Sequence, residues 1–541
     1  MLKINQIIEI VVLICHKKVK YTKHIEIFRF MRYNKMNIYI KRRSCVSAEK
    51  LNNKFHWGFA LILVTIFQVL TSTVAITANG FNSTLFMIFG GYIILEWVYF
   101  IIASTFCGQN NFELEIIGFL FSGIGLVNVA TVDDDYALKQ AVAIVLGLFM
   151  FIVMLVVMRR TDIVMKLRMP VAVAAVGLLV ANLALAKYTY GALNWITIGG
   201  LSIQPSEFVK LAFIFVGAAS LDKLQSARSI TKYLIFSIGC VGALFLMKDF
   251  GAALIFFFTF IIIAFMRSGD LRTIALVCVA ALLGAVMIVY FKPHVAARFK
   301  AYRHIWELIN DEGMQQTRTL IYSASGGLFG LGIGNGELRN VVFSETDLAF
   351  GMICEEWGLI VALTVVITYA FILLYAIKVA RNTRSAFYAI SACAAAGLLL
   401  FQTSLNIFGV TDILPFTGVT LPFISRGGSS IISSWGILAL IKSADIRTYP
   451  KLSQTILPDH PLYPPNIMIG KRTAKRKVYV PPVVNQPVKV KSPAKDVPVS
   501  KKRTPTSGNG DIPISRRSSS SAQKPKDIPI SRKKSGNGRA K

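Results

Sequence analysis

Residues 349–377 read AFGMICEEWGLIVALTVVITYAFILLYAI, and no charged residue follows Glu356 in this stretch. An apolar run of about 20 residues can cross the ~30 Å hydrocarbon core of a bilayer as a helix. Comparable runs recur along the chain and give twelve predicted spans: 57–78, 82–106, 114–131, 137–158, 168–187, 207–221, 233–247, 250–266, 273–291, 349–377, 387–405 and 429–443. Only 16% of the 541 residues are charged and 54% are hydrophobic, whereas soluble domains average about 25% charged residues. The sequence therefore predicts an all-α polytopic membrane protein and excludes an ordinary soluble enzyme.

The formal net charge of +31 is concentrated at the two ends of the chain. Residues 1–56 carry +10, and residues 444–541 carry +17 in a stretch rich in Pro, Ser, Lys and Gly. Such a stretch cannot bury enough apolar surface to fold. We therefore expect four parts: a basic N-terminal segment (1–56), two extra transmembrane helices (57–106), a membrane core (107–443) that includes a large outer loop (292–348), and a disordered basic tail (444–541). Basic ends suit an anionic membrane surface and do not indicate a nucleic-acid-binding domain.

The short loops predict the orientation of the chain in the membrane. Four of them are basic: 159–168, 222–232, 267–272 and 378–384. The positive-inside rule places such loops in the cytoplasm. The alternate connections then face outward: 132–136, 188–206, 248–249, 292–348 and 406–428. We expect a multi-pass protein with both termini in the cytoplasm.

Polar side chains that are costly at membrane depth gather in four clusters on the predicted outer side: residues 194–210, 248–251, 302–347 and 421–430. In the first cluster, Pro205 suits the first turn of a helix, which places Glu207 and Lys210 three residues apart on one face. Two interpretations remain open for this pair. It is either an ion pair at a helix start, where Glu207 complements the helix dipole, or the polar wall of a substrate cavity.

Asp347 is the residue for which we expect the central chemical role. It follows a glycine-dense loop and directly precedes an apolar helix. The structural alternative is that Thr346 or Asp347 serves as the N-cap of that helix. Glu355 and Glu356 lie about two turns further along the same helix. One of these carboxylates could pair with a buried cation such as Lys210.

The last predicted span begins with Arg426 followed by two glycines, Ser429 and Ser430. Free backbone amides, hydroxyl groups and the helix dipole attract an anion to such a start, and Arg426 could hold a phosphate with two hydrogen bonds. The alternative is a plain serine N-cap beside a snorkelling arginine. The glycine-dense stretch 325–336 has no strand–helix unit around it. We expect its glycines to allow the backbone to approach membrane, substrate or neighbouring helices closely.

Five blocks of this sequence resemble the shape, elongation, division and sporulation (SEDS) family, whose members include FtsW, RodA and SpoVE. The blocks are Asn194–Ile196 with Gln204–Lys210, Lys248–Leu254, Gln316 with Gly326–Gly332, Thr346–Gly358, and Leu414–Ser430. They occur in the family's order over roughly residues 114–443, and five blocks in order are a specific signal. The chain departs from the common wording at Arg426, where the family usually has tyrosine.

The resemblance implies a bundle of about ten core transmembrane helices, here with two extra N-terminal ones. It also implies a peptidoglycan glycosyltransferase that polymerises lipid II at the outer face of the bacterial plasma membrane, in cell division or elongation. In the family the aspartate of the Thr-Asp motif is essential, and it matches Asp347, the expected catalytic residue. Substrate binding is expected from Glu207, Lys210, Gln204, Ser206, Asp249, Gln316, Ser425, Arg426, Ser429 and Ser430. The expected partners are lipid II, a class B penicillin-binding protein acting as transpeptidase, and other division or elongation proteins.

We expect Asp347 to act as general base on the acceptor sugar hydroxyl. Stabilising the departing diphosphate must supply much of the remaining rate. Arg426, the helix start at Ser429, or a divalent cation (Mg²⁺ or Mn²⁺) held partly by Asp347 could do this, and the sequence leaves the choice open. The alternative function is a lipid II flippase or transporter, whose essential charges should line a path that reaches both membrane faces.

Overall fold

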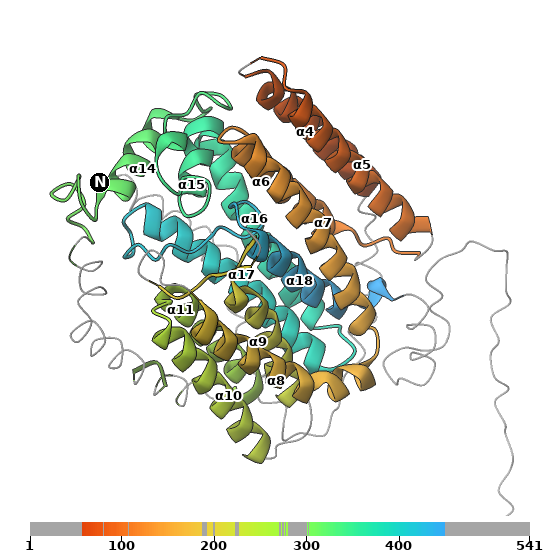
Figure 1. Cartoon of the computed structure of the whole chain (residues 1–541). Coiled ribbons are helices and arrows are strands. Elements are labelled where there is room, and N and C mark those ends of the chain that lie inside the picture. Colours follow the sequence, from red (N-terminus) through yellow and green to blue (C-terminus); the bar gives the residue numbers. More distant parts are fainter. Residues whose placement is uncertain are drawn as a thin grey trace, which may run out of the picture. The chain divides into compact units, whose positions relative to one another are not determined.

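The computed structural model describes residues 57–449 apart from short gaps (Figure 1). The gaps are 79, 106–107, 187–191, 199–200, 222–226, 270–271, 273–274, 276, 280–299 and 301. The predictions for segment 1–56, for the tail beyond residue 449 and for most of the span 273–291 therefore lie outside the described residues.

Helices dominate the described residues. In chain order they are α4 (Trp57–Thr77), α5 (Ser83–Thr105), α6 (Glu113–Ala130), α7 (Asp134–Val157), α8 (Thr161–Leu185), α9 (Pro205–Leu221), α10 (Ala227–Leu246), α11 (Phe250–Ser268), α14 (Met314–Ser325), α15 (Ala349–Met352), α16 (Gly358–Ala380), α17 (Ala386–Val410) and α18 (Gly428–Ala444). Short turns η1 (Leu338–Asn340), η2 (Ile353–Trp357, a π-helical turn) and η3 (Ile446–Thr448) adjoin them. A small antiparallel hairpin, β1 (Ile196–Ile198) and β2 (Leu201–Ile203), precedes α9.

The helices confirm the predicted fold class. Eight of the helical segments in the described part of the chain are long and apolar enough to cross a membrane, among them Ala349–Ala380, which joins α15, η2 and α16. Every predicted span apart from 273–291 overlaps a helix. The predicted starts of two spans are wrong, because α8 begins at Thr161 and not at residue 168, and α10 begins at Ala227 and not at residue 233. The protein is therefore an all-α multi-pass membrane protein.

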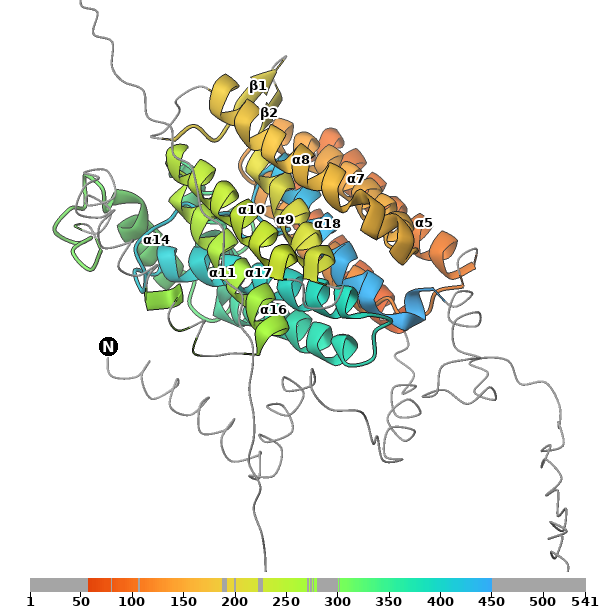
Figure 2. The same cartoon turned by 90° about the horizontal axis from the view of Figure 1, so that it is seen from below.

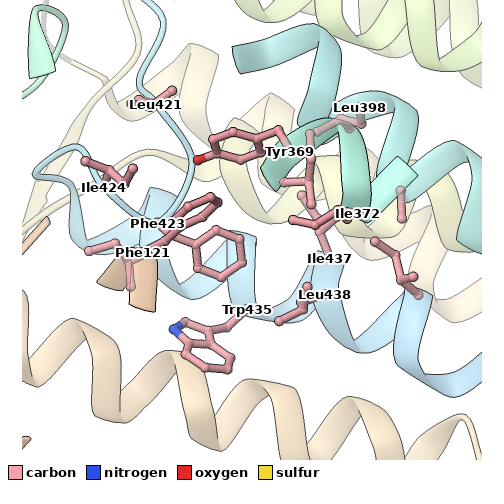
Figure 3. Close-up of a cluster of buried hydrophobic side chains, with 14 of the residues drawn as sticks. Phe121, Tyr369, Ile372, Leu398, Leu421, Phe423, Ile424, Trp435, Ile437 and Leu438 are labelled. Atoms are coloured by element: carbon pink, nitrogen blue, oxygen red, sulfur yellow. The ribbon is translucent and has the colours of Figure 1, made fainter. Parts of the chain in front are cut away.

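Helix α18 lies at the centre of the packing, where it contacts α7, α17, α9 and α6. Its Trp435 is fully buried, with ring centroids 5.0 Å from Phe119 and 5.7 Å from Phe423. Figure 3 shows Phe423, Phe121 and Tyr369 pointing toward one another above Trp435. Tyr369 also donates a hydrogen bond to the Pro422 carbonyl. These buried rings fix the residues just before α18, which belong to the candidate site described below.

Two further groups of helices surround this centre. Helices α8, α9, α10 and α11 lie side by side (Figure 2). On the other side α4 packs on α6, and α5 packs on α7 (Figure 1). The Tyr92 hydroxyl of α5 donates a hydrogen bond to the Phe119 carbonyl of α6. The two predicted extra helices are thus packed against the rest of the bundle.

The loops gather at two opposite ends of the bundle, as an alternating topology requires. At one end, Asn82 bonds Asp134 at 2.5 Å, and the Gln204 amide bonds Ser429 at 3.1 Å. We call this the Asp347 end. At the other end, the Arg384 guanidinium donates to the Arg159 carbonyl at 3.0 Å. We call this the Lys442 end, and residues of two predicted basic loops, 159–168 and 378–384, meet there. Which end faces the cytoplasm stays a prediction.

A buried ion pair stabilises the Lys442 end. The Lys442 ammonium lies 2.6 Å from the Glu115 carboxylate, and both side chains are fully buried. Lys442 also donates to the Asn111 carbonyl, and the Asn111 amide donates to Asp445 at 3.0 Å. Arg447 completes the network because its guanidinium contacts Asp445 at 2.7 Å. The network joins the start of α6 to the end of α18.

Asp445 gives this network a defined pH dependence. Burial alone would raise the pKa of Asp445, but the hydrogen bonds and charge of Arg447 outweigh burial and lower it. An acid with a lowered pKa in the folded state stabilises the fold above its unfolded pKa of about 3.9, and this contribution disappears as the pH falls. We expect Asp445→Asn to lower the melting temperature of the detergent-solubilised protein at pH 7. The difference from the wild type should persist down to about pH 4 and shrink only as the pH falls further, through the lowered pKa of Asp445. An equal difference at pH 7 and at about pH 2 would contradict this account.

Candidate active site

Asp347 lies in a tight turn at the start of α15. Phe343 adopts a positive φ of 67°, and the Asp347 amide donates to the Phe343 carbonyl at 3.0 Å. Helix α15 begins at Ala349, its N-cap is Leu348, and no side chain caps it. The structural alternative, in which Thr346 or Asp347 is the N-cap, is therefore wrong. The half-buried Asp347 side chain is not used to cap the helix.

The segment between α17 and α18, residues 411–427, holds this turn in place. Asn406 of α17 donates one hydrogen bond to the Asp347 carbonyl at 2.8 Å and another to the Val419 carbonyl at 2.7 Å. Ser425 donates to the Thr346 carbonyl and accepts from the Leu421 amide at 2.8 Å. Side chains of Asn406 and Ser425 thus connect the 411–427 segment to the Asp347 turn by hydrogen bonds to main-chain atoms.

The Asp347 carboxylate lies directly against Gly418. Gly418 has a φ of +66°, and a Cβ atom there would lie 3.1 Å from Asp347 Oδ2. Only glycine adopts this backbone conformation without strain. The close approach therefore depends on glycine at position 418.

Arg426 is held by an acidic neighbour of Asp347. Its guanidinium contacts the Glu345 carboxylate at 3.1 Å, and its backbone amide donates to the Glu345 carbonyl at 2.7 Å. The guanidinium also lies 3.9 Å above the ring of Tyr136 on α7. Arg426 remains 31% exposed. This pairing, not lipid snorkelling, accounts for its orientation, while phosphate binding by Arg426 stays a prediction.

The two serines at the start of α18 are engaged with other segments. The N-cap of α18 is Gly427, without a side-chain cap, so the serine N-cap alternative is wrong. The Ser429 hydroxyl accepts from the Gln204 amide at 3.1 Å, and Ser430 shares a hydrogen bond with Thr420 at 2.9 Å. The serines thus connect α18 to the residues before α9 and to the 411–427 segment.

Glu207 and Lys210 form a buried ion pair on α9. The ammonium and carboxylate are 2.7 Å apart, and the side chains of Lys210 and Glu207 are 3% and 7% exposed. Ser433 of α18 donates to Glu207 at 2.6 Å, and Lys210 donates to Gln402 of α17 at 2.9 Å. The structure confirms that Glu207 and Lys210 form an ion pair. Contact between this pair and the substrate stays a prediction.

The suggestion that Lys210 pairs with Glu355 or Glu356 is wrong. The Glu355 carboxylate accepts hydrogen bonds from the amides of Glu337 and Leu338, at 2.8 and 3.0 Å. It therefore caps η1, and the π-helical turn η2 carries it there.

The other predicted substrate-binding residues occupy separate places. Asp249 caps α11 by accepting from the Ala252 amide at 2.9 Å, and Gln204 lies 3.4 Å from it. Burial raises the pKa of Asp249, although the Ala252 hydrogen bond opposes this. Ser206 is buried in the first turn of α9. Gln316 of α14 donates to the Gly409 carbonyl at 2.8 Å and so joins α14 to the end of α17.

The glycine-dense stretch packs on the chain around η2. The Leu331 amide donates to the Glu355 carbonyl at 2.9 Å, and the Leu359 amide donates to the Gly327 carbonyl at 3.0 Å. A Cβ atom at Gly330 would lie 2.2 Å from the Glu356 carbonyl oxygen. Close backbone approach is therefore confirmed, and a neighbouring helical segment is what the glycines approach.

The described residues show no metal cluster at the Asp347 turn, and the cavity found among them lies elsewhere. Within the described ranges, no group of three or more His, Cys, Asp or Glu side chains could hold a metal ion. A polar cavity of about 280 Å³ lies between the α4–α5 turn and Arg339, and Asp347 does not line it.

Two polar residues of α17 were not predicted. Gln402 and Asn406 lie four residues apart, hence on one helix face, and both are buried. The available signal was their occurrence in an otherwise apolar span, because polar groups at membrane depth are costly unless they have partners.

The fold and this arrangement of side chains define a multi-pass helical membrane protein with a carboxylate at one end of the bundle. The family model for FtsW/RodA/SpoVE, described as cell cycle protein, matches residues 112–449. The chain belongs to this family. Helices α4 and α5 precede the matched residues.

Two relatives and one solved structure illustrate the similarity. The chain is 28% identical to the probable peptidoglycan glycosyltransferase FtsW of Bacillus subtilis (strain 168), over 64% of this chain and 89% of the relative. It is 31% identical to the corresponding protein of Buchnera aphidicola subsp. Acyrthosiphon pisum, over 52% and 74%. A solved structure described as structural coordination of polymerization and crosslinking by a peptidoglycan synthase complex covers 61% of this chain and 96% of its own, at 24% identity and a TM-score of 0.53. This structure supports the fold.

Proposed function

We propose that this protein is a peptidoglycan glycosyltransferase that polymerises lipid II into glycan strands. Its family membership and the names of its relatives support the reaction class. The observation that carries the proposal is Asp347, a half-buried carboxylate held by main-chain hydrogen bonds at one end of a membrane bundle. A carboxylate in a fixed position suits general base catalysis.

In the proposed reaction, Asp347 accepts the proton of the acceptor GlcNAc 4-hydroxyl. The oxygen attacks the anomeric carbon of the donor MurNAc with inversion, so a new carbon–oxygen bond forms. The bond from that carbon to the lipid diphosphate breaks, and its electron pair leaves with the diphosphate. The donor therefore carries its own driving force, and no ATP is needed on the outer side of the membrane.

In the proposed reaction, the exposed part of Arg426 faces the departing diphosphate, because Arg426 is held beside the Asp347 turn by its contact with Glu345. Ser429 and the start of α18 add hydrogen-bond donors nearby. Mg²⁺ accepts one or two carboxylates together with substrate phosphates, so binding of a divalent cation by Asp347 and the diphosphate stays part of the proposal. Titration with a chelator in the polymerisation assay tests it.

We further propose that the protein acts in the bacterial plasma membrane with both termini in the cytoplasm. The basic loops at the Lys442 end support this orientation. The proposed partner is a class B penicillin-binding protein, which would crosslink the strands in division or elongation. A partner of this kind is supported by the solved relative, a peptidoglycan synthase complex in which polymerization and crosslinking are coordinated.

Gly418→Ala tests whether the position of the Asp347 carboxylate matters. The added Cβ would lie 3.1 Å from Asp347 Oδ2 and would strain the backbone at φ +66°. Displacement of a catalytic group by about 1 Å can cost about 10²-fold in rate, and we expect a loss of that order in the polymerisation assay. Gly327→Ala is the matched control because it has a similar φ of +56° but no neighbour within 4 Å. Equal losses in both variants would contradict this account.

The function is tested with purified protein in liposomes supplied with lipid II, with and without the partner. The proposal expects glycan strands from the protein. A fluorescent lipid II analogue in the same liposomes measures transfer between leaflets. Transfer without polymer, under both conditions, would support the flippase alternative and contradict the proposal.

A further inference from the structure

We propose that Gln402 and Asn406, one turn apart on the same face of α17, are positioning residues for Asp347. The inference rests on the proposed function, because it assigns these side chains the task of holding the reacting carboxylate. Neither residue carries a charge, and both act through the 411–427 segment or through main-chain atoms.

The side-chain amide of Asn406 forms hydrogen bonds with two loops, the Asp347 turn and the 411–427 segment. Its nitrogen donates to the Asp347 carbonyl at 2.8 Å and to the Val419 carbonyl at 2.7 Å, and the side chain is 3% exposed. An amide nitrogen supplies two donors, which is what two facing carbonyls require. The Asn406 oxygen has no hydrogen-bond partner among the described residues. The donors are therefore the functional part of this side chain.

Gln402, one helical turn before Asn406, forms a hydrogen bond with the same 411–427 segment. Its nitrogen donates to the Thr420 carbonyl at 2.9 Å, and its oxygen accepts from the Lys210 ammonium at 2.9 Å. The side chain is 1% exposed. Gln402 therefore connects the buried Glu207–Lys210 ion pair to a residue that lies two positions from Gly418.

The contacts form a continuous path to the carboxylate. The ion pair contacts Gln402, Gln402 contacts Thr420, and Thr420 is joined through Val419 to Gly418, which lies against Asp347. Asn406 adds a second connection, because it donates hydrogen bonds to the carbonyls of both Val419 and Asp347. The Glu207–Lys210 pair is thus connected to Asp347 through Gln402 and the 411–427 segment.

The test compares isosteric variants that remove donors. Asn406→Asp places oxygens against both carbonyls, and Gln402→Glu removes the donor to Thr420 while keeping the acceptor for Lys210. We expect the kcat of polymerisation to fall by about 10²-fold in Asn406→Asp, with KM within about threefold of the wild type. Asn182→Asp is the matched control, because Asn182 is a buried asparagine whose nitrogen donates to the Leu193 carbonyl at 3.2 Å. Unchanged kcat in Asn406→Asp, or an equal loss in Asn182→Asp, would overturn the inference.

Hydrogen exchange separates this inference from the proposed function. The amides of Asp347 and Leu421 are both hydrogen bonded in the wild type. We expect them to exchange at least about tenfold faster in Asn406→Asp, while the amides of α7 keep their rates. If the wild type itself makes no polymer while local exchange rises in Asn406→Asp, the proposed function is refuted and the positioning role of Asn406 remains. If exchange rises throughout the bundle in Asn406→Asp, that variant is replaced by Asn406→Ser, whose hydroxyl keeps one donor. Exchange in the Asp347 turn of Asn406→Ser at the wild-type rate would overturn the inference.

Discussion

Replacement of Asp347 by asparagine is expected to slow glycan polymerisation by about 10²–10⁴-fold, the usual contribution of a general base. Asparagine has nearly the same shape but cannot take the proton. The fold should be retained because the turn is held by the carbonyls of Thr346 and Asp347, which the substitution leaves in place. The rate is measured on purified protein in liposomes with lipid II, and the melting temperature is measured on the same sample.

Asp412→Asn is the matched control for this variant. Asp412 lies at the same end of the bundle, and its carboxylate accepts from the Arg303 amide at 3.1 Å. Asp412→Asn changes the charge equally but leaves in place the hydrogen bonds from Asn406 and Ser425 to the Asp347 turn, so the polymerisation rate should stay within about twofold. Equal rates in Asp347→Asn and Asp412→Asn would remove Asp347 from the mechanism.

Replacement of Lys442 by methionine is expected to destabilise the bundle by about 3–5 kcal/mol, because Glu115 would remain as an unpaired buried charge. Lys442 and Glu115 are both fully buried and 2.6 Å apart, so water cannot compensate for the lost partner. Reversible unfolding in mixed micelles measures the loss. A solvent-exposed lysine such as Lys378 has no such cost, and Lys378→Met serves as the control.

The double variant Lys442→Met with Glu115→Leu separates the pair from the packing around it. With both charges removed, most of the lost stability should return, because a buried ion pair and apolar residues of similar size often stabilise equally. If Lys442→Met alone is as stable as the wild type, the account of the Lys442 end is wrong.

The helices could be predicted because the bilayer imposes a length and an apolar composition on each span. Even α18, with only 17 residues, matches the predicted span 429–443 closely. The Glu207–Lys210 ion pair could also be predicted, since residues three apart on a helix are neighbours on one face. The clustering of the basic loops at one end follows from alternating connections, whereas the extra contacts of α4 and α5 with the bundle required the structure.

The local geometry of the site could not be predicted. The N-cap interpretations of Asp347 and of Ser429 failed because each helix starts where the preceding backbone turns, at Leu348 and Gly427. Glu355 was assigned the wrong partner because the π-helical turn redirects it toward amides 17 and 18 residues earlier in the chain. These directions depend on tertiary packing, which hydrophobic periodicity does not encode.

The hydrogen bonds that join distant segments at the site could not be predicted, for the same reason. Asn406 bonds residues 59 positions before it and 13 positions after it. Only the structure shows that Glu345 is the partner of Arg426. Buried polar residues in an apolar span indicate that partners exist, but the sequence does not name them.

The central claim is that the Asp347 carboxylate accepts a proton during polymerisation, and the pH dependence of single-turnover polymerisation tests it most directly. The account predicts that the wild-type rate falls as the pH is lowered, because a protonated carboxylate cannot act as a base. The residual rate of Asp347→Asn should lack this decrease. A variant whose rate follows the same pH profile as the wild type would contradict the claim.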